Sequence, residues 1–275
     1  FSGVILVNAA MYFVALKGLK DYAELYETAV PPEHKNLKDI WKDVRNIIFS
    51  KPFITYLLFY IIARGAIGYY FTPFLYFMDH VVKADGVMAT LADVIPGLIM
   101  LALLPFAGKL IKKYGSKFIT LLSFIPAIIG FGSLMFITKG WHAIISYTLI
   151  VFSLNVIQTA GVVLNGELID YDEMQSGTRK TGLYGGLFAL LTTSLTALQA
   201  TIFSNILSRY GYDGTATAQS AEAVWGIRVG AGLVPIIMCV VGFIPMLFFP
   251  IGRKLEKEIS DFNVKARGKE VEAHE

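Results

Sequence analysis

Long runs of apolar residues, separated by short polar stretches, make up most of the chain. A helix needs about 20 such residues to cross the roughly 30 Å hydrocarbon layer of a membrane. Six runs reach this length, and a seventh at the start of the chain is shorter. The pattern predicts an all-α membrane protein whose spans are 1–16 (partial), 52–78, 87–107, 118–138, 142–165, 181–206 and 226–250.

Composition supports the same class, because 55% of the 275 residues are hydrophobic and 16% are charged. Soluble domains contain roughly 25% charged residues. The run at 1–16 has no basic segment before Phe1 and no small-residue cleavage site after it, so it does not resemble a signal peptide. We interpret it as the end of a span whose beginning is missing, which makes this chain the C-terminal portion of a longer protein.

Polar segments at 17–51 and 251–275 flank the transmembrane region 52–250. In the first, apolar positions between Leu37 and Ile48 share one helical face, which predicts an amphipathic helix in the cytoplasmic interface. This segment is either a joint between two transmembrane bundles or a solubilising linker. The tail alternates charges of both signs, and we expect a short exposed helix there that frays into disorder.

Basic residues concentrate on one side of the predicted topology. Nineteen of the 24 Lys and Arg residues lie in the alternate segments 17–51, 108–117, 166–180 and the tail. The opposite connections carry four when Arg228, at the start of the next span, is counted with them. Cytoplasmic loops of membrane proteins carry an excess of Lys and Arg. The first set is therefore predicted to be cytoplasmic in a multi-pass protein of the cell membrane.

Several classes of chemistry lack their sequence signatures. The chain has no phosphate-binding G-x-x-x-x-G-K-[ST] loop, so uphill transport would draw its energy from an ion gradient. Cys239 is the single cysteine, and the four histidines have no partner at metal-ligand spacing. No nucleophile–base pair is visible. We expect no enzyme, no metal site, no cofactor other than the ion of such a gradient, and no nucleic-acid partner.

Arg64 is the deepest charge in the predicted spans. It lies 12 residues after Pro52, about 18 Å along a helix and near the middle of the bilayer. An arginine at that depth costs roughly 3 kcal/mol even on the lenient insertion scale. Arg64 therefore either faces a solute or an ion, or serves as a structural partner of carbonyls or a carboxylate.

Other polar side chains in the spans cluster on helical faces. Asn155, Gln158 and Thr159 share one face, where they either bind solute hydroxyls or hydrogen-bond between helices. Asp93 lies toward the outer leaflet, where it is a candidate ionisable group or simply reaches water. Three threonines of the span 181–206 complete the predicted solute-binding set, although small residues at this spacing also mark close helix packing: Thr192, Thr193 and Thr196.

Two connections point to a known family. The segment 108–117 reads GKLIKKYGSK and resembles the G-x-L-x-x-x-x-G-x-[K/R] signature of short loops in the major facilitator superfamily. The segment 166–186 reads GELIDYDEMQSGTRKTGLYGG. It is similar to the helix 10–11 loop of the glycoside–pentoside–hexuronide:cation symporters, the melibiose-permease-like branch.

This resemblance implies a 12-helix fold of two six-helix bundles, of which the chain holds the end of helix 6 and helices 7–12. It also implies alternating access around a central site. The partners would be a small polar, sugar-like solute, a coupling cation, the lipid bilayer and the absent N-terminal six-helix bundle. The loop charges would form gating ion pairs on the cytoplasmic side, unless they are simply solvated; the implied gate comprises Glu167, Asp170, Tyr171, Asp172 and Arg179.

One position departs from the family pattern. Many members have a lysine midway along helix 11, where this chain has Thr193. We hypothesise that Arg64, at similar depth on helix 7, supplies the cation instead. The sequence thus predicts a cation-coupled symporter of a sugar-like solute. Two alternatives are a lipid or amphiphile transporter of the same fold and a non-transporting membrane scaffold or receptor.

Overall fold

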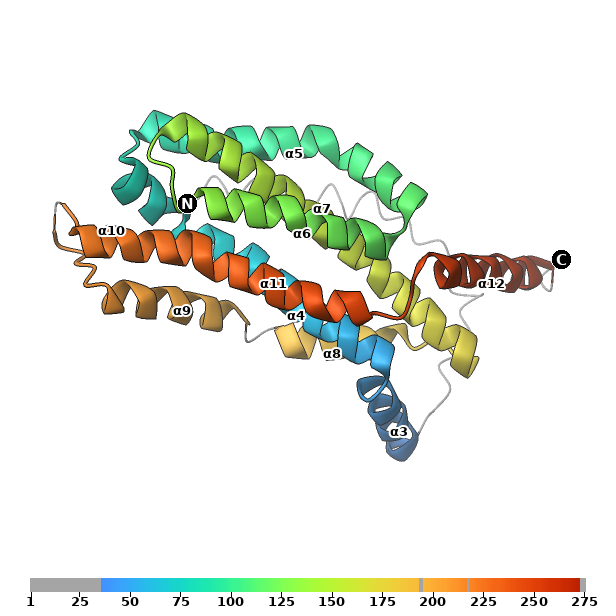
Figure 1. Ribbon diagram of the computed structural model, residues 1–275. Helices are drawn as coiled ribbons and strands as arrows, with labels where there is room; N and C mark the ends of the chain where they lie inside the picture. Colours follow the sequence, from blue (N-terminus) through green and yellow to red (C-terminus); the bar gives the residue numbers. More distant parts are fainter. Residues whose placement is uncertain (1–35, 193–194, 217, 273–275) are drawn as a thin grey trace, which may run out of the picture. The chain divides into compact units, whose positions relative to one another are not determined.

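A computed structural model describes residues 36–192, 195–216 and 218–272, without the side chains of 37, 192, 195–197 and 266–272 (Figure 1). The chain divides into two compact units, Phe1–Asp43 and Val44–Glu275. Of the first unit, the structure describes the beginning of α3 (Leu37–Ile48). The expected end of a span at 1–16 and most of the expected linker 17–51 lie outside the described residues.

Every regular element in the described ranges is a helix. Five continuous helical stretches there are long and apolar enough to cross a membrane: Lys51–Val82, Gly86–Tyr114, Ser116–Ser133, Gly140–Ser176 and Ala221–Phe248. The second unit contains α4 (Lys51–Tyr76), the π-helical η1 (Phe77–Val82), α5 (Gly86–Tyr114), α6 (Ser116–Ser133), α7 (Gly140–Ser176), α8 (Thr181–Thr192), α9 (Leu195–Arg209), α10 (Ala221–Arg228), the π-helical η2 (Val229–Leu233), α11 (Val234–Phe248) and α12 (Arg253–Glu272). The all-α membrane class is confirmed.

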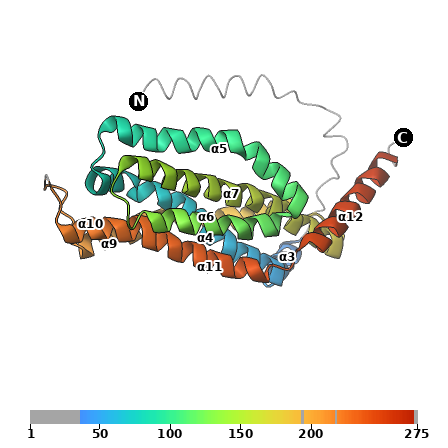
Figure 2. The same cartoon turned by 45° about the horizontal axis from the view of Figure 1, so that its top comes forward.

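The long helices of the second unit pack side by side (Figures 1 and 2). Helix α7 packs against α5, α6 and α4, while α11 packs against α4 and α6. The core between them is rich in aromatic rings, with Tyr56, Phe59 and Phe124 almost fully buried. Many large apolar side chains of α5 and α11 are exposed instead, as expected of helices that face lipid or a partner bundle.

Glycines allow the closest approaches between these helices. A Cβ atom added to Gly130 of α6 would lie 2.7 Å from Ile150 Cγ1 and 3.1 Å from the backbone oxygen of Ser146, both on α7. A Cβ atom on Gly232 in η2 would lie 2.9 Å from the backbone oxygen of Phe131. Such distances are shorter than side-chain carbons tolerate. The tight packing of α6 therefore depends on glycine, which has no side-chain carbon, at these two positions.

The predicted loop at 108–117 is wrong. Helix α5 continues to Tyr114, α6 begins at Ser116, and Gly115 alone connects them. Gly115 has φ +95°, a conformation that glycine adopts without strain. The lysines of this stretch interrupted the apolar pattern, but lysine is a good helix former, and the helix continues beyond its apolar part.

The predicted loop at 166–180 is also wrong, because α7 continues to Ser176 and the connection to α8 comprises residues 177–180. The tail forms the expected helix, α12, from Arg253 to Glu272, and its expected fraying stays a prediction because 273–275 lie outside the described residues. In both segments charge ends the apolar periodicity without ending the helix. The end of α7 is marked instead by a helix C-cap, Gly177, with φ +71°.

The end of α7, the α5–α6 junction and the start of α12 lie together at one end of the bundle, opposite the α9–α10 connection (Figures 1 and 2). At the opposite end, the guanidinium of Arg228 donates to the backbone oxygens of Leu134 and Met135, both at 3.0 Å. A cation at a helix C-terminus satisfies free carbonyl groups and interacts favourably with the helix dipole. This contact ties α10 to the end of α6.

Candidate functional site

Arg64 lies on α4 with its side chain exposed. It lines a small cavity of about 60 Å³ between α4 and α7, together with Gln158 of α7. Two aromatic residues, Phe59 and Tyr60, line the same cavity. The sequence predicted that Arg64 and Gln158 lie at similar depth, and the fold brings both to one cavity.

The guanidinium of Arg64 makes no hydrogen bond or ion pair with the described part of the chain. A charged group inside a membrane helix normally faces a bundle interior or a water-filled space rather than lipid. An arginine presents five N–H donors and cannot lose its charge. This side of α4 and α7 is therefore a candidate surface for water, a ligand or another bundle.

The other two predicted solute-binding residues of α7, Asn155 and Thr159, line different cavities from Gln158. The side-chain nitrogen of Asn155 donates to the Val151 backbone oxygen at 2.8 Å, and the Thr159 hydroxyl donates to the Asn155 backbone oxygen at 2.8 Å. These bonds lie within one helix, so neither residue is bound to a neighbouring helix by them. The oxygen of the Asn155 amide is left able to accept from a ligand.

A second cavity, of about 260 Å³, lies toward the other end of the same helices. Asp93 of α5, Tyr70 of α4 and Asn155 of α7 line it with apolar neighbours. Asp93 is exposed and makes no ion pair within the described residues. The fold thus places a carboxylate and an amide around one space, next to the cavity of Arg64 because Ile67 lines both.

The three threonines of the predicted site cannot be placed in it. Thr193 lies outside the described residues. Thr192 ends α8 and Thr196 lies in the first turn of α9, but their side chains are outside the description. Their role in solute binding stays a prediction.

The residues of the implied gate lie on α7 and just after it. Arg179 Nη2 lies 2.9 Å from Asp170 Oδ1, and Arg179 Nη1 lies 2.6 Å from Glu173 Oε2. Lys180 Nζ lies 3.2 Å from Asp172 Oδ2. The connection after α7 is therefore folded back onto the helix by ion pairs.

The remaining two gate residues have other surroundings. Tyr171 is half-buried and packs against the core. Glu167 has no ion pair among the described residues, and its carboxylate oxygens lie 2.9 and 2.8 Å from the hydroxyl oxygen of Ser116. Glu167 therefore belongs to a separate cluster.

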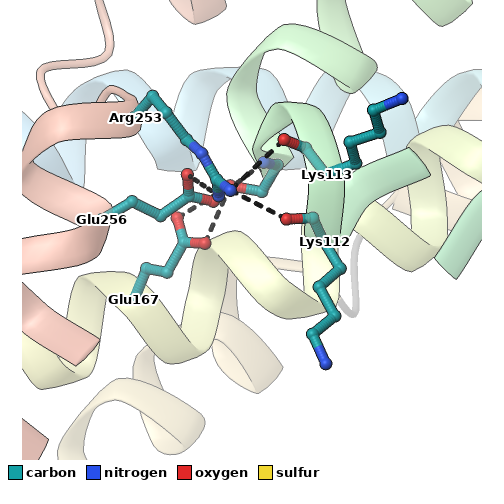
Figure 3. Close-up of polar contacts among 6 residues, drawn as sticks. Lys112, Lys113, Glu167, Arg253 and Glu256 are labelled. Atoms are coloured by element: carbon teal, nitrogen blue, oxygen red, sulfur yellow. Dashed lines mark hydrogen bonds and ion pairs between the residues drawn. The ribbon is translucent and has the colours of Figure 1, made fainter. Parts of the chain in front are cut away.

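That cluster joins four helices (Figure 3). The backbone N–H of Ser116 at the start of α6 donates to Glu256 Oε1 of α12 at 3.0 Å. Arg253 Nη1 pairs with Glu256 Oε2 at 3.0 Å. Arg253 Nη2 donates to the backbone oxygens of Lys112 and Lys113 of α5, at 2.9 and 3.3 Å.

Sequence reasoning missed the residues of this cluster other than Glu167. Arg253 and Glu256 looked like members of a solvated run of alternating charges. Ser116 looked like part of a loop. A faint signal exists, since Ser116 follows a glycine at a helix start, where an acidic side chain is favourable. Nothing in the spacing of the tail indicates that it supplies that acid.

A cavity of about 680 Å³ lies beside the cluster, between α5, α7 and α12. Glu167, Asp170, Thr159, Lys257 and Asn263 are among its lining residues. Within the described ranges, no three His, Cys, Asp or Glu side chains gather in a group that could hold a metal ion.

Two known proteins are similar to this chain in sequence. The chain is 22% identical over 262 residues to the uncharacterized symporter YnaJ of Bacillus subtilis (strain 168), which covers 92% of this chain and 54% of that protein. It is 25% identical over 188 residues to the glucuronide carrier protein homolog of Escherichia coli (strain K12), covering 67% of this chain and 41% of that protein. The chain thus spans about half the length of the curated relatives it matches.

The family model described as MFS/sugar transport protein matches residues 1–253, which is most of the chain. This match confirms the resemblance to the major facilitator superfamily that the two connecting segments indicated. The proteins of this family are transporters, and the relatives named above are a symporter and a carrier homolog. The chain belongs to the MFS/sugar transport protein family.

Proposed function

We propose that the full-length protein is a cation-coupled symporter of a sugar or sugar-like solute. The described helices would be helices 7–12 of a twelve-helix transporter, with α8 and α9 together as helix 11. The observation that carries this proposal is Arg64, an exposed guanidinium without a partner in the described chain, in one cavity with the amide of Gln158. Such donors inside a membrane bundle suit a solute rich in oxygen.

The lining of the cavity favours a sugar over a lipid. Gln158 offers both donors and acceptors for hydroxyl groups, and Tyr60 and Phe59 offer ring faces for the apolar side of a pyranose. A cavity of about 60 Å³ holds only part of such a solute. The rest would be held by the N-terminal bundle, which the resemblance places across a central site.

A carboxylated sugar is the class that Arg64 would bind most strongly. A guanidinium forms paired, charge-assisted hydrogen bonds with a carboxylate. The name of one relative, the glucuronide carrier protein homolog, mentions a sugar of this class. We therefore include a glucuronide among the test solutes.

Alternating access would follow from rocking of two bundles around the central site. The ion pairs of Arg179 with Asp170 and Glu173 close the end of α7 and would serve as part of a gate. The coupling cation would be Na⁺ or H⁺. Asp93, an exposed carboxylate in the second cavity, is a candidate for a coupled ionisable group.

Counterflow into proteoliposomes tests the transport proposal. The full-length protein should exchange labelled glucuronide or hexose against internal unlabelled solute, and a Na⁺ or H⁺ gradient should drive accumulation. Empty liposomes and a full-length protein with Arg64→Ala are the controls. Exchange of labelled lysophospholipid without exchange of any sugar would replace the proposal by the lipid-transporter alternative.

We further propose that the α5–α6 junction and α12 lie in the cytoplasm, because the basic residues concentrate there. The side chain of Lys254, 94% exposed, is suited to a test. With Lys254→Cys in a Cys239→Ala background, a membrane-impermeant maleimide should react in inverted vesicles and not in intact cells. Labelling from the outside of intact cells would reverse the orientation.

A further inference from the structure

Two carboxyl groups converge on one hydroxyl at the junction of α6, α7 and α12. Ser116 Oγ lies 2.9 and 2.8 Å from the two carboxylate oxygens of Glu167 and 3.2 Å from Glu256 Oε1 (Figure 3). A serine hydroxyl carries a single hydrogen, so it donates fully to one acceptor. With both carboxylates ionised, this one hydroxyl hydrogen would lie between two negative charges.

The neighbouring cations are not placed to neutralise Glu167. Arg253 is bound to Glu256 and to two backbone oxygens of α5. The side chains of Lys112 and Lys113 extend away from the carboxylates (Figure 3). In the described chain, no lysine or arginine nitrogen forms an ion pair with Glu167, so its charge would stand beside that of Glu256.

The other charged groups around the pair are already matched or lie in the adjacent cavity. Asp170, one turn beyond Glu167 on α7, is bound to Arg179 and accepts from Asn263 at 2.7 Å. Lys257 lines the cavity of about 680 Å³ that also borders Glu167 and Glu256. That cavity gives protons and water a route to the pair.

Glu256 is the member of the pair that keeps its charge. It accepts from the backbone N–H of Ser116 at a helix start and pairs with Arg253. Burial alone would raise the pKa of Glu256, but hydrogen bonds from its neighbours, Glu167 first among them, hold that pKa below its ordinary value. A proton bound by this pair would therefore reside on Glu167, whose hydrogen-bond partner in the described chain is the Ser116 hydroxyl.

We propose that Glu167 and Glu256 form a proton-binding site. In this site a neutral Glu167 donates to the Ser116 hydroxyl, and that hydroxyl donates to an ionised Glu256. The bound proton and the docked tail helix therefore stabilise each other. When Glu167 loses its proton, two like charges face each other across one hydroxyl, and the contact of α12 with α6 and α7 weakens. The ligand of this site is H⁺, whichever solute the protein carries.

The sign of the pH effect follows from this linkage. A carboxyl group that is neutral in the docked state and ionised in the undocked state favours docking at low pH, and this contribution is lost as the pH rises. Docking of α12 is therefore expected to loosen between about pH 6 and about pH 9, within the range reached by buried, acid-paired carboxyl groups.

Hydrogen exchange of the full-length protein in nanodiscs tests the site. After correction for the intrinsic pH dependence of exchange, amides of residues 253–263 should lose protection by roughly tenfold or more between the two pH values, as expected for a coupled carboxyl pair. Glu167→Gln, whose amide donates at every pH, should retain protection throughout. Glu258→Gln, on the same helix but outside the cluster, should behave like the unmodified protein.

Two further measurements test the proton-binding site. Glu256→Gln should reduce the protection of α12 at both pH values, because it removes the charge that pairs with Arg253 and leaves one acceptor oxygen where Glu256 has two. The infrared band of a neutral carboxyl group should be present near neutral pH and absent in Glu167→Gln. Protection independent of pH in the unmodified protein, or a band unchanged by Glu167→Gln, would overturn the proposal without bearing on solute transport.

Discussion

Alanine in place of Arg64 is expected to reduce solute uptake by the full-length protein by about ten- to a hundredfold. A hydrogen bond to a charged group contributes roughly 1.5–3 kcal/mol, and about 1.4 kcal/mol corresponds to a factor of ten. Arg64 is exposed to its cavity and has no competing partner in the described chain. Its donors are therefore available to a solute, and the loss should appear in uptake by proteoliposomes.

Matched variants separate this effect from a general loss of charge. Arg209→Ala removes an exposed arginine near the end of α9, away from both cavities, and should leave uptake unchanged. Arg64→Lys keeps the positive charge but loses the planar pair of donors, so a neutral sugar should be affected less than a glucuronide. Uptake that remains normal in Arg64→Ala would contradict the proposed role of this residue.

Alanine in place of Gly130 is expected to destabilise the bundle by about 1–3 kcal/mol, the usual effect of overpacking a filled interior. The new Cβ atom would lie 2.7 Å from Ile150 Cγ1 and 3.1 Å from the backbone oxygen of Ser146. The Ile150 side chain can move, but the backbone of α7 can shift only together with its helix. Thermal unfolding of the purified full-length protein in detergent should show a midpoint several degrees lower.

Gly97→Ala is the control for this change. Gly97 also lies inside a helix, α5, but a Cβ atom added there meets nothing within 4 Å. Alanine is the better helix former by up to about 1 kcal/mol, so the unfolding midpoint should stay the same or rise. If both variants unfold at the same temperature, the close α6–α7 contact does not limit stability.

Apolar run length was sufficient to find the five helical stretches of the described residues that can cross a membrane. The spans predicted at 52–78 and 87–107 correspond to the stretches Lys51–Val82 and Gly86–Tyr114. Their ends were misplaced because apolar periodicity reports where a helix leaves the bilayer, and a helix can continue in water. Gly115 and Gly177, which have positive φ, mark the true ends of α5 and α7.

The site was only partly predictable. Arg64 and Gln158 stood out because a polar group in an apolar run is costly, and such a cost is visible in the sequence. The partnership of Glu167 with Ser116 and Glu256 was not visible, because it joins residues up to 140 positions apart in segments that are polar anyway. Contacts of this kind depend on how α12 returns to the bundle, which no local pattern encodes.

Helices α5 and α6 are connected by one residue, Gly115, which is the pivot between them. Gly115 is flanked directly by the last residue of one helix and the first of the next, so the chain has no slack there. Arg253 holds the α5 side of this pivot and Glu256 holds the α6 side. A change in the angle between α5 and α6 would therefore displace α12, which is bound to both. The position of the tail helix would then report movement within the bundle.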